Sequence, residues 1–324
     1  MTPEGADGAR AGVSFTHLDD GLFDGAGATK RDLVEYLDAI SDRILPALRD
    51  RPLSVIRVHR GQDAFMQKNL PKYTPDWVRT VRVWAEASKR DVTYALCNDR
   101  RTLLWFANQR AIEYHPALAR ADRLDRVTHL VLDLDPPEGE PFSTVVRVAH
   151  LVHQALDDTG LRAAVKTSGA KGVHVFVPVE RRLALDDSAA ATRALAARVV
   201  ALDPSIATTA FVKEERDGKV FVDSTRVGGA TVVAAYSPRV RPGAPVSFPL
   251  TWDELDQVTP PDLTIHTALD RLGDRDPWAE AMPSPQRVPP DLIAEGHGIP
   301  VPRVAAMHEG LRRARARRAT AAAD

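Results

Sequence analysis

Two aspartates, Asp133 and Asp135, stand one residue apart at the end of the apolar stretch HLVLDLD (129–135), and two prolines follow them. Successive side chains of a strand point to opposite faces, so both carboxylates project from one face, with Cα atoms about 7 Å apart. Two unpaired carboxylates on a half-buried sheet repel each other, and a divalent cation removes that repulsion. Hard oxygen ligands suit Mg²⁺ or Mn²⁺. The spacing predicts a metal site, left open because Pro136 and Pro137 end strand pairing.

The Asp-x-Asp pattern alone does not select a reaction. Metal-dependent glycosyltransferases use the same pattern with Mn²⁺ and a sugar nucleotide. An ordinary strand end also tolerates two aspartates that cap the next turn. Other segments must therefore show which substrate the carboxylates serve.

A second segment, KTSGAKGVHVF, joins two predicted strands (162–167 and 172–179) through a short turn. Gly169 and Gly172 allow the backbone to turn tightly and to present N–H groups to a phosphate. A hydroxyl, an ammonium and an imidazole accompany the turn, supplied by Ser168, Lys171 and His174. These groups suit a triphosphate site, although a plain hairpin with a surface lysine fits the same residues.

Charged residues in three later segments complete the candidate site. Asp223 ends another apolar strand, VFVD, and sheet pairing would bring it to the metal ions as a third carboxylate. Lys213 and Arg216, in KEER, either face an anionic substrate or form a solvated charge run. Arg239 and Arg241 stand two residues apart and share a face in extended chain, which suits a polyanion but is also unremarkable for a surface.

Hydrophobic periodicity predicts the elements that position these residues. A helix begins after Thr29, which forms a capping box with Asp32, and runs to about Leu48, with Pro46 kinking or ending it. Further helices are predicted at 143–160, 186–203 and 251–258. Strands are predicted at 53–60, 76–86, 92–97, 127–135, 219–225 and 230–237, with 100–116 either helix or strand. This mixture indicates an α/β or α+β fold whose sheet carries the site.

Composition limits the class of protein. The chain has 324 residues, 44% of them hydrophobic, which suffices for one large domain or two small ones. Its single cysteine, Cys97, excludes an internal disulfide framework and fits a reducing compartment.

The start lacks a secretory signal, and no apolar run reaches the ~20 residues of a transmembrane helix, so we expect a soluble, cytoplasmic protein without a membrane partner. A net charge of −1 leaves nucleic-acid binding to local patches. The arginine-rich segment 311–319 is one candidate, although it is also typical of a solvated tail.

Together the motifs resemble a known family. HLVLDLDPPEG, KTSGAKGVHVFVPV, KEERDGKVFVD and YSPRVRPGAPVSFPLTWDEL, in this order, are similar to the polymerase domain of bacterial ligase D, a branch of the archaeo-eukaryotic primase superfamily. TKRDLVEYL, FMQKNLP, PDWV and EYHP also match in order, so the resemblance covers roughly residues 20–270. It implies an α+β fold, with a primase-like catalytic core whose RRM-like sheet packs against an N-terminal α/β region.

The resemblance implies template-dependent nucleotidyl transfer in DNA repair. A primer 3′-hydroxyl attacks the α-phosphate of a ribo- or deoxyribonucleoside triphosphate, and pyrophosphate leaves. Two divalent ions, Mn²⁺ or Mg²⁺, would be bound by Asp133, Asp135 and Asp223. The implied nucleotide-binding residues are Ser168, Lys171, His174, His115, Arg57, Arg239 and Arg241. The implied DNA contacts are Lys30, Phe65, Lys213 and Arg216, with Phe65 either stacking on a base or filling the core.

We expect a flexible N-terminus (1–14), a polymerase domain (15–275) and a C-terminal arm, rich first in proline and then in arginine (276–324). The length leaves no room for the ligase and phosphoesterase modules of the fused enzymes. This predicts a stand-alone, nucleoid-associated polymerase that acts beside a separate DNA ligase and an end-binding protein. Gly25 stands where end-joining members carry a second lysine for a 5′-phosphate, and STRVGGAT after Asp223 lacks the usual asparagines. Both departures favour gap filling or primer extension over end bridging.

Two other functions remain open from the sequence: an Asp-x-Asp glycosyltransferase, and a non-catalytic DNA-binding module that kept the fold. The first has no evident use for a three-phosphate site, and the second has no reason to retain three carboxylates. Turnover of a sugar nucleotide would identify the first. DNA binding that is unaffected by Asp133→Ala would identify the second.

Overall fold

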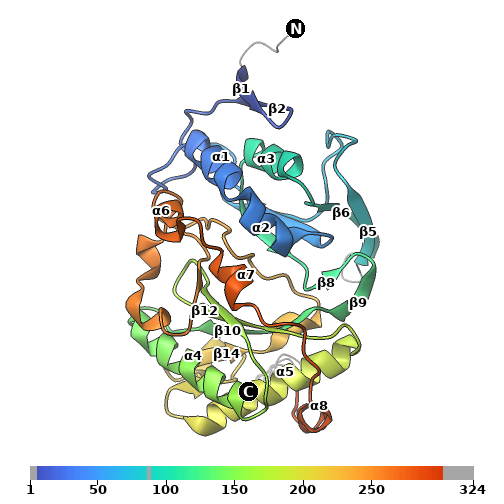
Figure 1. Ribbon diagram of the computed structural model, residues 1–324, viewed down its shortest axis with the longest axis vertical. Coiled ribbons are helices and arrows are strands. Elements are labelled where there is room, and N and C mark those ends of the chain that lie inside the picture. The colour runs from blue at the N-terminus through green and yellow to red at the C-terminus, as the bar shows by residue number, and fades with distance from the viewer. Residues whose placement is uncertain (1–5, 86–88, 302–324) are drawn as a thin grey trace, which may run out of the picture.

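The structure is a computed structural model that describes residues 6–85 and 89–301 (Figure 1). Two β-sheets, each accompanied by helices, share one hydrophobic core, so the predicted α+β class is confirmed. In Figure 1 the sheet built from the N-terminal third of the chain lies above, and the sheet that carries the aspartates lies below.

The lower sheet has six strands and carries Asp133, Asp135 and Asp223. In spatial order its strands are β13 (Ala207–Thr208), β14 (Val220–Asp223), β10 (His129–Asp135), β12 (Val173–Pro178), β11 (Ala164–Thr167) and β15 (Pro249–Leu250). All neighbouring strands are antiparallel except β13 and β14. The predicted hairpin around residues 168–172 is confirmed as the connection between β11 and β12.

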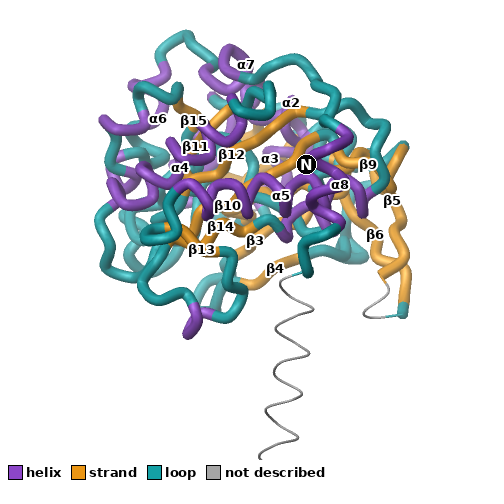
Figure 2. The backbone as a smooth tube through the Cα atoms, turned by 90° about the horizontal axis from the view of Figure 1, so that it is seen from below, coloured by secondary structure: helices purple, strands orange, loops and turns teal. Residues whose placement is uncertain are grey.

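The alternation along β10 sets which face each side chain occupies. Leu130, Leu132 and Leu134 are buried. Helices α4 (Phe142–Asp157) and α5 (Leu185–Leu202) pack against this strand and cross the sheet in Figure 2. Because successive residues of a strand alternate in direction, the aspartates of β10 project from the face opposite the leucines.

The upper sheet contributes one strand to the site. Its strands are β4 (Phe65–Gln67), β3 (Pro52–Arg57), β6 (Arg90–Leu96) and β5 (Thr80–Ala85), with β7 (Ala111–Pro116) paired to β3. Its helices are α1 (Lys30–Ala39), α2 (Ser41–Leu48) and α3 (Arg100–Asn108), of which α2 and α3 pack against β7. The segment 100–116, ambiguous in sequence, is therefore a helix followed by a strand.

Smaller elements surround the two sheets. Two hairpins are formed by β1 (Ala6–Arg10) with β2 (Val13–Thr16) and by β8 (Ala119–Arg120) with β9 (Arg123–Val127). The last helices up to residue 301 are α6 (Ala268–Leu272), α7 (Pro277–Ala281) and α8 (Pro290–His297), and α8 packs on α5. The arginine-rich segment 311–319 lies outside the described residues. Within residues 6–85 and 89–301, none of the helices has both the length and the apolar composition needed to cross a bilayer.

Two predicted helices differ from the structure. The capping box of Thr29 with Asp32 is confirmed, but the helix breaks at Ile40, which ends α1 and precedes α2, while Pro46 lies inside α2. The helix predicted at 251–258 is reduced to the 3-10 turn Leu255–Gln257.

Two further segments differ as well. Residues 230–237 form no strand, because Tyr236 has a φ of +66° and the backbone amides of Ala234 and Tyr236 donate to two different segments, at Tyr114 O and Ser247 O. In the N-terminus, which we expected to be flexible, residues 6–10 and 13–16 pair as the β1–β2 hairpin, and Val13 is buried.

Candidate active site

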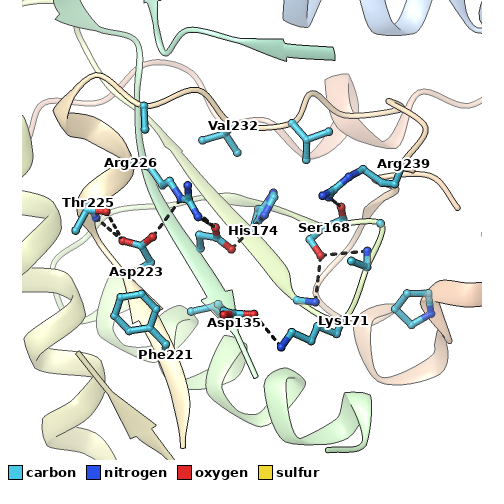
Figure 3. Close-up of a pocket in the computed structure, with 18 of the residues that line it drawn as sticks. Asp135, Ser168, Lys171, His174, Phe221, Asp223, Thr225, Arg226, Val232 and Arg239 are labelled. Atoms are coloured by element: carbon cyan, nitrogen blue, oxygen red, sulfur yellow. Dashed lines mark hydrogen bonds and ion pairs between the residues drawn. The ribbon is translucent and has the colours of Figure 1, made fainter. Parts of the chain in front are cut away.

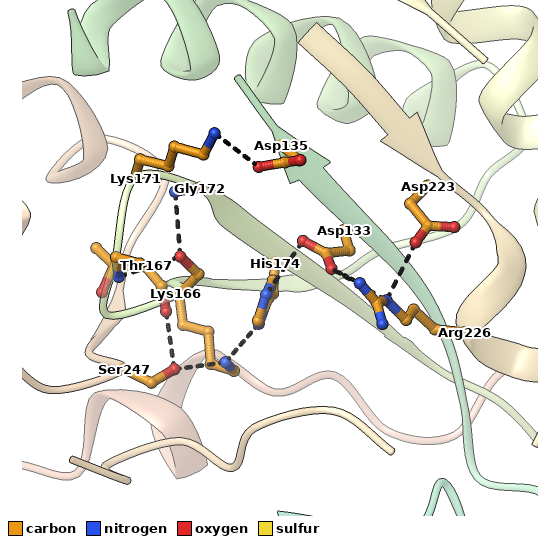
Figure 4. A network of polar contacts seen from close by, with 12 residues as sticks. Asp133, Asp135, Lys166, Thr167, Lys171, Gly172, His174, Asp223, Arg226 and Ser247 are labelled. Carbon is orange, nitrogen blue, oxygen red and sulfur yellow. Dashed lines mark hydrogen bonds and ion pairs between the residues drawn. The ribbon is translucent and has the colours of Figure 1, made fainter. Parts of the chain in front are cut away.

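Charged and titratable side chains lie in one row across the six-stranded sheet (Figure 4). Asp133 on β10 pairs with His174 on β12 in the strand register, and with Asp223 on β14 on its other side. His174 in turn pairs with Lys166 on β11. Asp135 lies two residues beyond Asp133 and therefore projects from the same face. Strand pairing thus brings together residues that are far apart in the sequence.

The row borders a cavity of about 1550 Å³ (Figure 3). The predicted site residues that line it are Asp133, Asp135, Asp223, Ser168, Lys171, His174, His115, Arg239, Arg241, Lys213 and Arg216. Carboxylates and cations therefore meet at one opening that is large enough for a nucleotide.

Asp133 lies at the centre of the row, and both of its oxygens are engaged. Its Oδ1 lies 3.2 Å from Nε2 of His174, and its Oδ2 accepts hydrogen bonds from Nε and Nη2 of Arg226 at 3.0 and 2.7 Å. Burial alone would raise the pKa of Asp133, but His174 and then Arg226 hold it well below its usual range. Asp133 is therefore an anion at neutral pH.

Arg226 bridges two of the carboxylates from the 3-10 turn Thr225–Gly228, directly after β14. Its Nε also lies 3.2 Å from Oδ2 of Asp223. The other oxygen of Asp223, Oδ1, accepts hydrogen bonds from the backbone N and the hydroxyl of Thr225 at 2.8 and 2.6 Å. Burial would lower the pKa of Arg226, but Asp133 and Asp223 raise it above its ordinary value. The guanidinium is thus a permanent cation between two anions.

Asp135 is more exposed and has different cationic partners. Nζ of Lys171 lies 3.4 Å from its Oδ1, and Nη1 of Arg216 lies 3.3 Å from its Oδ2. Lys171 also pairs with Glu138 at 3.0 Å, and the guanidinium carbon of Arg216 lies 3.9 Å from the ring centre of Phe221. Each of the three predicted metal-binding carboxylates therefore has a cationic partner from the protein itself.

Lys166 extends the row beyond His174 and is fully buried. Its Nζ lies 2.8 Å from Nδ1 of His174 and donates to Oγ of Ser247 at 2.6 Å, while that hydroxyl donates to the carbonyl of Thr167 at 2.8 Å. Burial lowers the pKa of His174 to about 4 and that of Lys166 well below its ordinary value. Because Asp133 can only accept, His174 presents its Nε2–H to that carboxylate.

The loop between β11 and β12 folds around a serine hydroxyl. Oγ of Ser168 accepts hydrogen bonds from the backbone N of Ala170 at 3.2 Å and of Gly172 at 3.1 Å. These two amides therefore donate to the serine hydroxyl inside the loop. The sequence had predicted that amides of this turn would face a phosphate instead. Gly169 has a φ of +70°, and a Cβ there would lie 2.6 Å from Cγ of Arg239. The loop thus packs directly on the segment that carries Arg239.

Glu113 on β7 is a buried carboxylate that holds two of the predicted nucleotide-binding residues. Its Oε2 lies 2.7 Å from Nε2 of His115 and 3.1 Å from Nε of Arg239, and its Oε1 accepts from the amide of Val240 at 2.8 Å. Arg239 also donates to the carbonyl of Ser168. Burial would raise the pKa of Glu113, but His115 and Arg239 lower it to about 2.

Three predicted site residues, Arg57, Phe65 and Lys30, are not among the residues that line the cavity. Arg57 is buried in the upper sheet, where it donates to the carbonyl of Gln109 at 2.7 Å and to Oε1 of Gln67 at 2.6 Å. Phe65 on β4 is 38% exposed and stacks near Arg57, outside the residues that line the cavity.

Lys30, predicted to contact DNA, is buried instead. Its Nζ donates to the carbonyl of Thr16 at 2.6 Å and to Oδ1 of Asn108 at 2.7 Å. An ammonium that is bound by two internal oxygens cannot reach a DNA phosphate without breaking these bonds. The structure therefore gives no support to Lys30 as a DNA contact.

Sequence reasoning assigned no specific role to three residues of the site: Arg226, Lys166 and Glu113. Two of them carried a signal, because Lys166 and Glu113 stand two residues before Ser168 and His115, at the spacing that shares a face in extended chain. The contact of Arg226 with Asp133 carried none, since the two lie 93 residues apart in the sequence, although its other partner, Asp223, stands only three residues before it.

The types of side chain suit a divalent cation, since carboxylate oxygens are the ligands that Mg²⁺ and Mn²⁺ prefer. Their arrangement does not provide a ready site. Among the described residues, no three His, Cys, Asp or Glu side chains converge on a point where an ion could bind. The guanidinium of Arg226 takes the space between Asp133 and Asp223.

Comparisons with known proteins bear on this geometry. The family model described as "LigD, primase-polymerase domain" matches residues 29–278. The chain belongs to this family. The predicted resemblance is thereby confirmed, and with it the enzyme class of a nucleotidyltransferase or polymerase. A glycosyltransferase is no longer supported.

Two curated relatives and one solved structure illustrate the similarity. The bifunctional non-homologous end joining protein LigD of Bacillus subtilis is 31% identical over 287 residues, which are 87% of this chain and 46% of that protein. The multifunctional LigD of Mycolicibacterium smegmatis is 31% identical over 267 residues, 81% of this chain and 35% of that protein. The polymerase domain of Mycobacterium tuberculosis ligase D in complex with DNA has a TM-score of 0.76 and 31% identity, covering 84% of this chain and 99% of that one. The chain thus spans less than half the length of these two curated relatives, and the primase-like fold is confirmed.

Proposed function

We propose that this chain is a template-dependent nucleotidyltransferase that adds ribo- or deoxyribonucleotides to a primer 3′ end during DNA repair, by gap filling or end joining. The observation that carries the proposal is the row Asp223, Asp133 and His174 beside a cavity lined by cations. In the reaction, the primer 3′-hydroxyl forms a bond to the α-phosphorus while the bond to pyrophosphate breaks. The family assignment supports this chemistry.

The cations around the cavity would bind the triphosphate. Lys171 and Arg241 line the cavity, and Glu113 holds His115 and Arg239 at the same opening. A nucleoside triphosphate is a polyanion, and charge-assisted hydrogen bonds to its oxygens are stronger than neutral ones. Arg57 lies outside this group, so its proposed contact with the nucleotide loses support.

Two divalent ions, Mn²⁺ or Mg²⁺, complete the proposal. Asp133, Asp135 and Asp223 are the residues that would hold them, because they are carboxylates at one end of one sheet. When bound, the ions would neutralise charge that develops on the reacting phosphate and the departing oxygen. The protein's own cations must first release these carboxylates.

DNA is the proposed template and primer. The similar solved domain is a complex with DNA. In this chain Lys213 is exposed and lines the cavity, as does Arg216, and the partly exposed Phe65 offers a ring on which a base can stack. A DNA ligase activity and an end-binding protein are the proposed partners, at the nucleoid. Because Gly25 replaces a lysine, we propose that filling of gaps is favoured over bridging of ends.

The experiment is primer extension on a 5′-phosphorylated gapped duplex, with Mn²⁺ or Mg²⁺ and either ribo- or deoxyribonucleotides. We expect templated extension by the wild type and none by the Asp133→Ala, Asp135→Ala double variant. Comparison of the two sugars gives the nucleotide preference, and a blunt duplex with a 5′-phosphate compares ends with gaps.

Absence of extension with either metal would refute the proposal. DNA affinity that persists in that case, and that is unchanged in the double variant, would identify the remaining alternative of a non-catalytic DNA-binding module. Such binding would weaken steeply with salt, because phosphate contacts release counterions.

A further inference from the structure

The carboxylates of the row have few free lone pairs. Oδ2 of Asp133 accepts two N–H groups of Arg226, and its Oδ1 faces the Nε2–H of His174. Oδ1 of Asp223 accepts two hydrogen bonds from Thr225, and its Oδ2 faces Nε of Arg226. A carboxylate offers about four acceptor positions, so each of these two has about one left. The position left on Asp223 is on Oδ2, the oxygen that already faces the Arg226 guanidinium, so a bridging ion would have to bind where that cation lies.

Arg226 differs from the other partners of the carboxylates in the row. His174 contacts one of the three carboxylates, Asp133, and Arg216 likewise contacts Asp135 alone. Arg226 lies within 3.2 Å of both Asp133 and Asp223 (Figure 4). Its guanidinium therefore occupies the position at which one cation can touch both carboxylates.

We propose that Arg226 is an internal counter-ion that competes with a divalent cation for Asp133 and Asp223, and that an ion can bridge the two only after Arg226 has left them. This inference rests on the metal use in the proposed function. A guanidinium and a metal ion cannot share the gap, because both are cations and both need the same oxygens. The Arg226 side chain has space to move away from the carboxylates, because it is 37% exposed and borders the cavity.

The competition has a definite thermodynamic sign. In the free protein, Arg226 stabilises two buried carboxylates that would otherwise repel each other. The same contacts must be broken when the ion binds, so the measured affinity for the ion is reduced by the strength of those contacts. Removing the guanidinium should therefore weaken the free protein and strengthen its binding of the ion.

The test measures Mn²⁺ binding directly, by the electron paramagnetic resonance signal of the free ion, in the full chain without DNA or nucleotide. Arg226→Gln keeps a side-chain N–H donor but removes the charge. Arg181→Gln is the matched control, because Arg181 also makes a two-pronged contact, at 2.7 and 3.0 Å, but to the exposed Asp122 away from the cavity. We expect the Kd for Mn²⁺ to fall about tenfold in Arg226→Gln and to stay unchanged in Arg181→Gln, a tenfold change being about 1.4 kcal/mol.

Thermal unfolding provides the second readout, and it also shows whether the Arg226→Gln variant is folded. Without Mn²⁺ the Tm of Arg226→Gln should lie below that of the wild type, and added Mn²⁺ should raise it by more than it raises the wild type, since tighter binding to the folded state stabilises more. An equal or weaker Mn²⁺ affinity in Arg226→Gln, with the wild type binding Mn²⁺ and extending primers, overturns the inference and leaves the proposed function intact. Failure of both proteins to bind Mn²⁺ overturns the inference together with the proposed metal use.

Discussion

At the scale of single residues, Glu113 shows how one buried carboxylate organises several groups. His115 lies on β7 and lines the cavity, whereas Arg239 and Val240 come from a segment more than 100 residues later. All three contact the side chain of Glu113. Arg239 continues to the carbonyl of Ser168. Glu113 therefore connects the upper sheet to the loop between β11 and β12.

The first prediction concerns the stability of Glu113→Gln as a function of pH. The pKa of Glu113 falls from an ordinary 4.5 to about 2 in the folded protein. A carboxyl whose folded pKa is lowered stabilises the protein above its unfolded pKa, and this contribution is lost as the pH falls from about 4.5 towards 2. We expect Glu113→Gln to be less stable than the wild type at pH 7, by the order of 3 kcal/mol, and the difference to shrink below pH 4.5.

Urea unfolding at pH 7, 4.5 and 3 measures this difference. Glu35→Gln is the matched control, because its carboxylate is half exposed and lies 3.5 Å from Arg10 on the surface. A deficit of Glu113→Gln that stays constant from pH 7 to pH 3 would contradict the prediction.

The predictable part of the site is what local spacing determines. Alternation along β10 placed Asp133 and Asp135 on one face, and strand pairing brought Asp223 beside Asp133 as expected. The position of His174 on the other side of Asp133 was not predicted. The ion pairs could not be foreseen, since the contact of Arg226 with Asp133 depends on how a 3-10 turn leaves β14. No periodicity of the sequence encodes that direction.

At the scale of elements, the loop between β11 and β12 is restricted by close packing. Gly169 combines a φ of +70° with a position where a Cβ would lie 2.6 Å from Cγ of Arg239 and 2.8 Å from the amide of Ser247. Gly139 has a similar φ of +81° but nothing within 4 Å. Comparing substitutions at the two glycines therefore distinguishes the energetic cost of positive φ from the cost of steric crowding.

The second prediction compares Gly169→Ala with Gly139→Ala. Both substitutions place a side chain at positive φ, which costs roughly 1 kcal/mol. Only Gly169→Ala also forces the loop away from Arg239 and Ser247, for an additional loss of about 1–3 kcal/mol. We expect chemical denaturation to show the larger loss for Gly169→Ala, and nucleotide affinity to fall in that variant alone. Equal effects of the two substitutions would exclude crowding as the cause.

Helices and strands were predictable where the burial pattern and local capping residues indicate the same element. They were not predictable where tertiary contacts determine the backbone conformation. The capping box at Thr29, the alternation of β10 and the strand β12 were found as expected. Residues 230–237 have the β-branched and apolar composition of a strand, yet their amides donate to separate segments and Tyr236 turns the chain. The break at Ile40 likewise has no marker in the sequence, since the proline that suggested one lies further on, inside α2.

At the scale of the whole molecule, helix α8 packs closely against α5. Arg193 donates to the carbonyl of Gly296 at 3.1 Å, and Arg198 pairs with Glu295 at 2.6 Å. A Cβ on Gly296 would lie 1.8 Å from the carbonyl oxygen of Ala190. The two helices can approach this closely only because this position has no side chain.

The third prediction is that Gly296→Ala separates α8 from α5. The clash is with backbone, so a whole helix must move, and we expect a loss of unfolding free energy of about 1–3 kcal/mol together with faster proteolysis near the C-terminus. Gly21→Ala is the matched control, because its Cβ would meet nothing within 4 Å and its φ is not positive. Urea unfolding and limited trypsin digestion measure both variants, and a Gly296→Ala protein as stable and as resistant as Gly21→Ala would show that α8 contributes little.

The cavity takes its lining from both halves of the molecule: His115 comes from the upper sheet, and Asp133 and His174 come from the lower one. A nucleotide bound there would contact both halves, so its binding free energy would oppose their separation. Nucleotide at 100 times its Kd would add roughly 2.7 kcal/mol to the unfolding free energy. Melting curves with and without a nucleoside triphosphate measure this stabilisation, and an unchanged Tm would refute it.

The thermal stability of this protein would then follow the metabolic state of its cell, falling when triphosphates run short and returning when they are replenished.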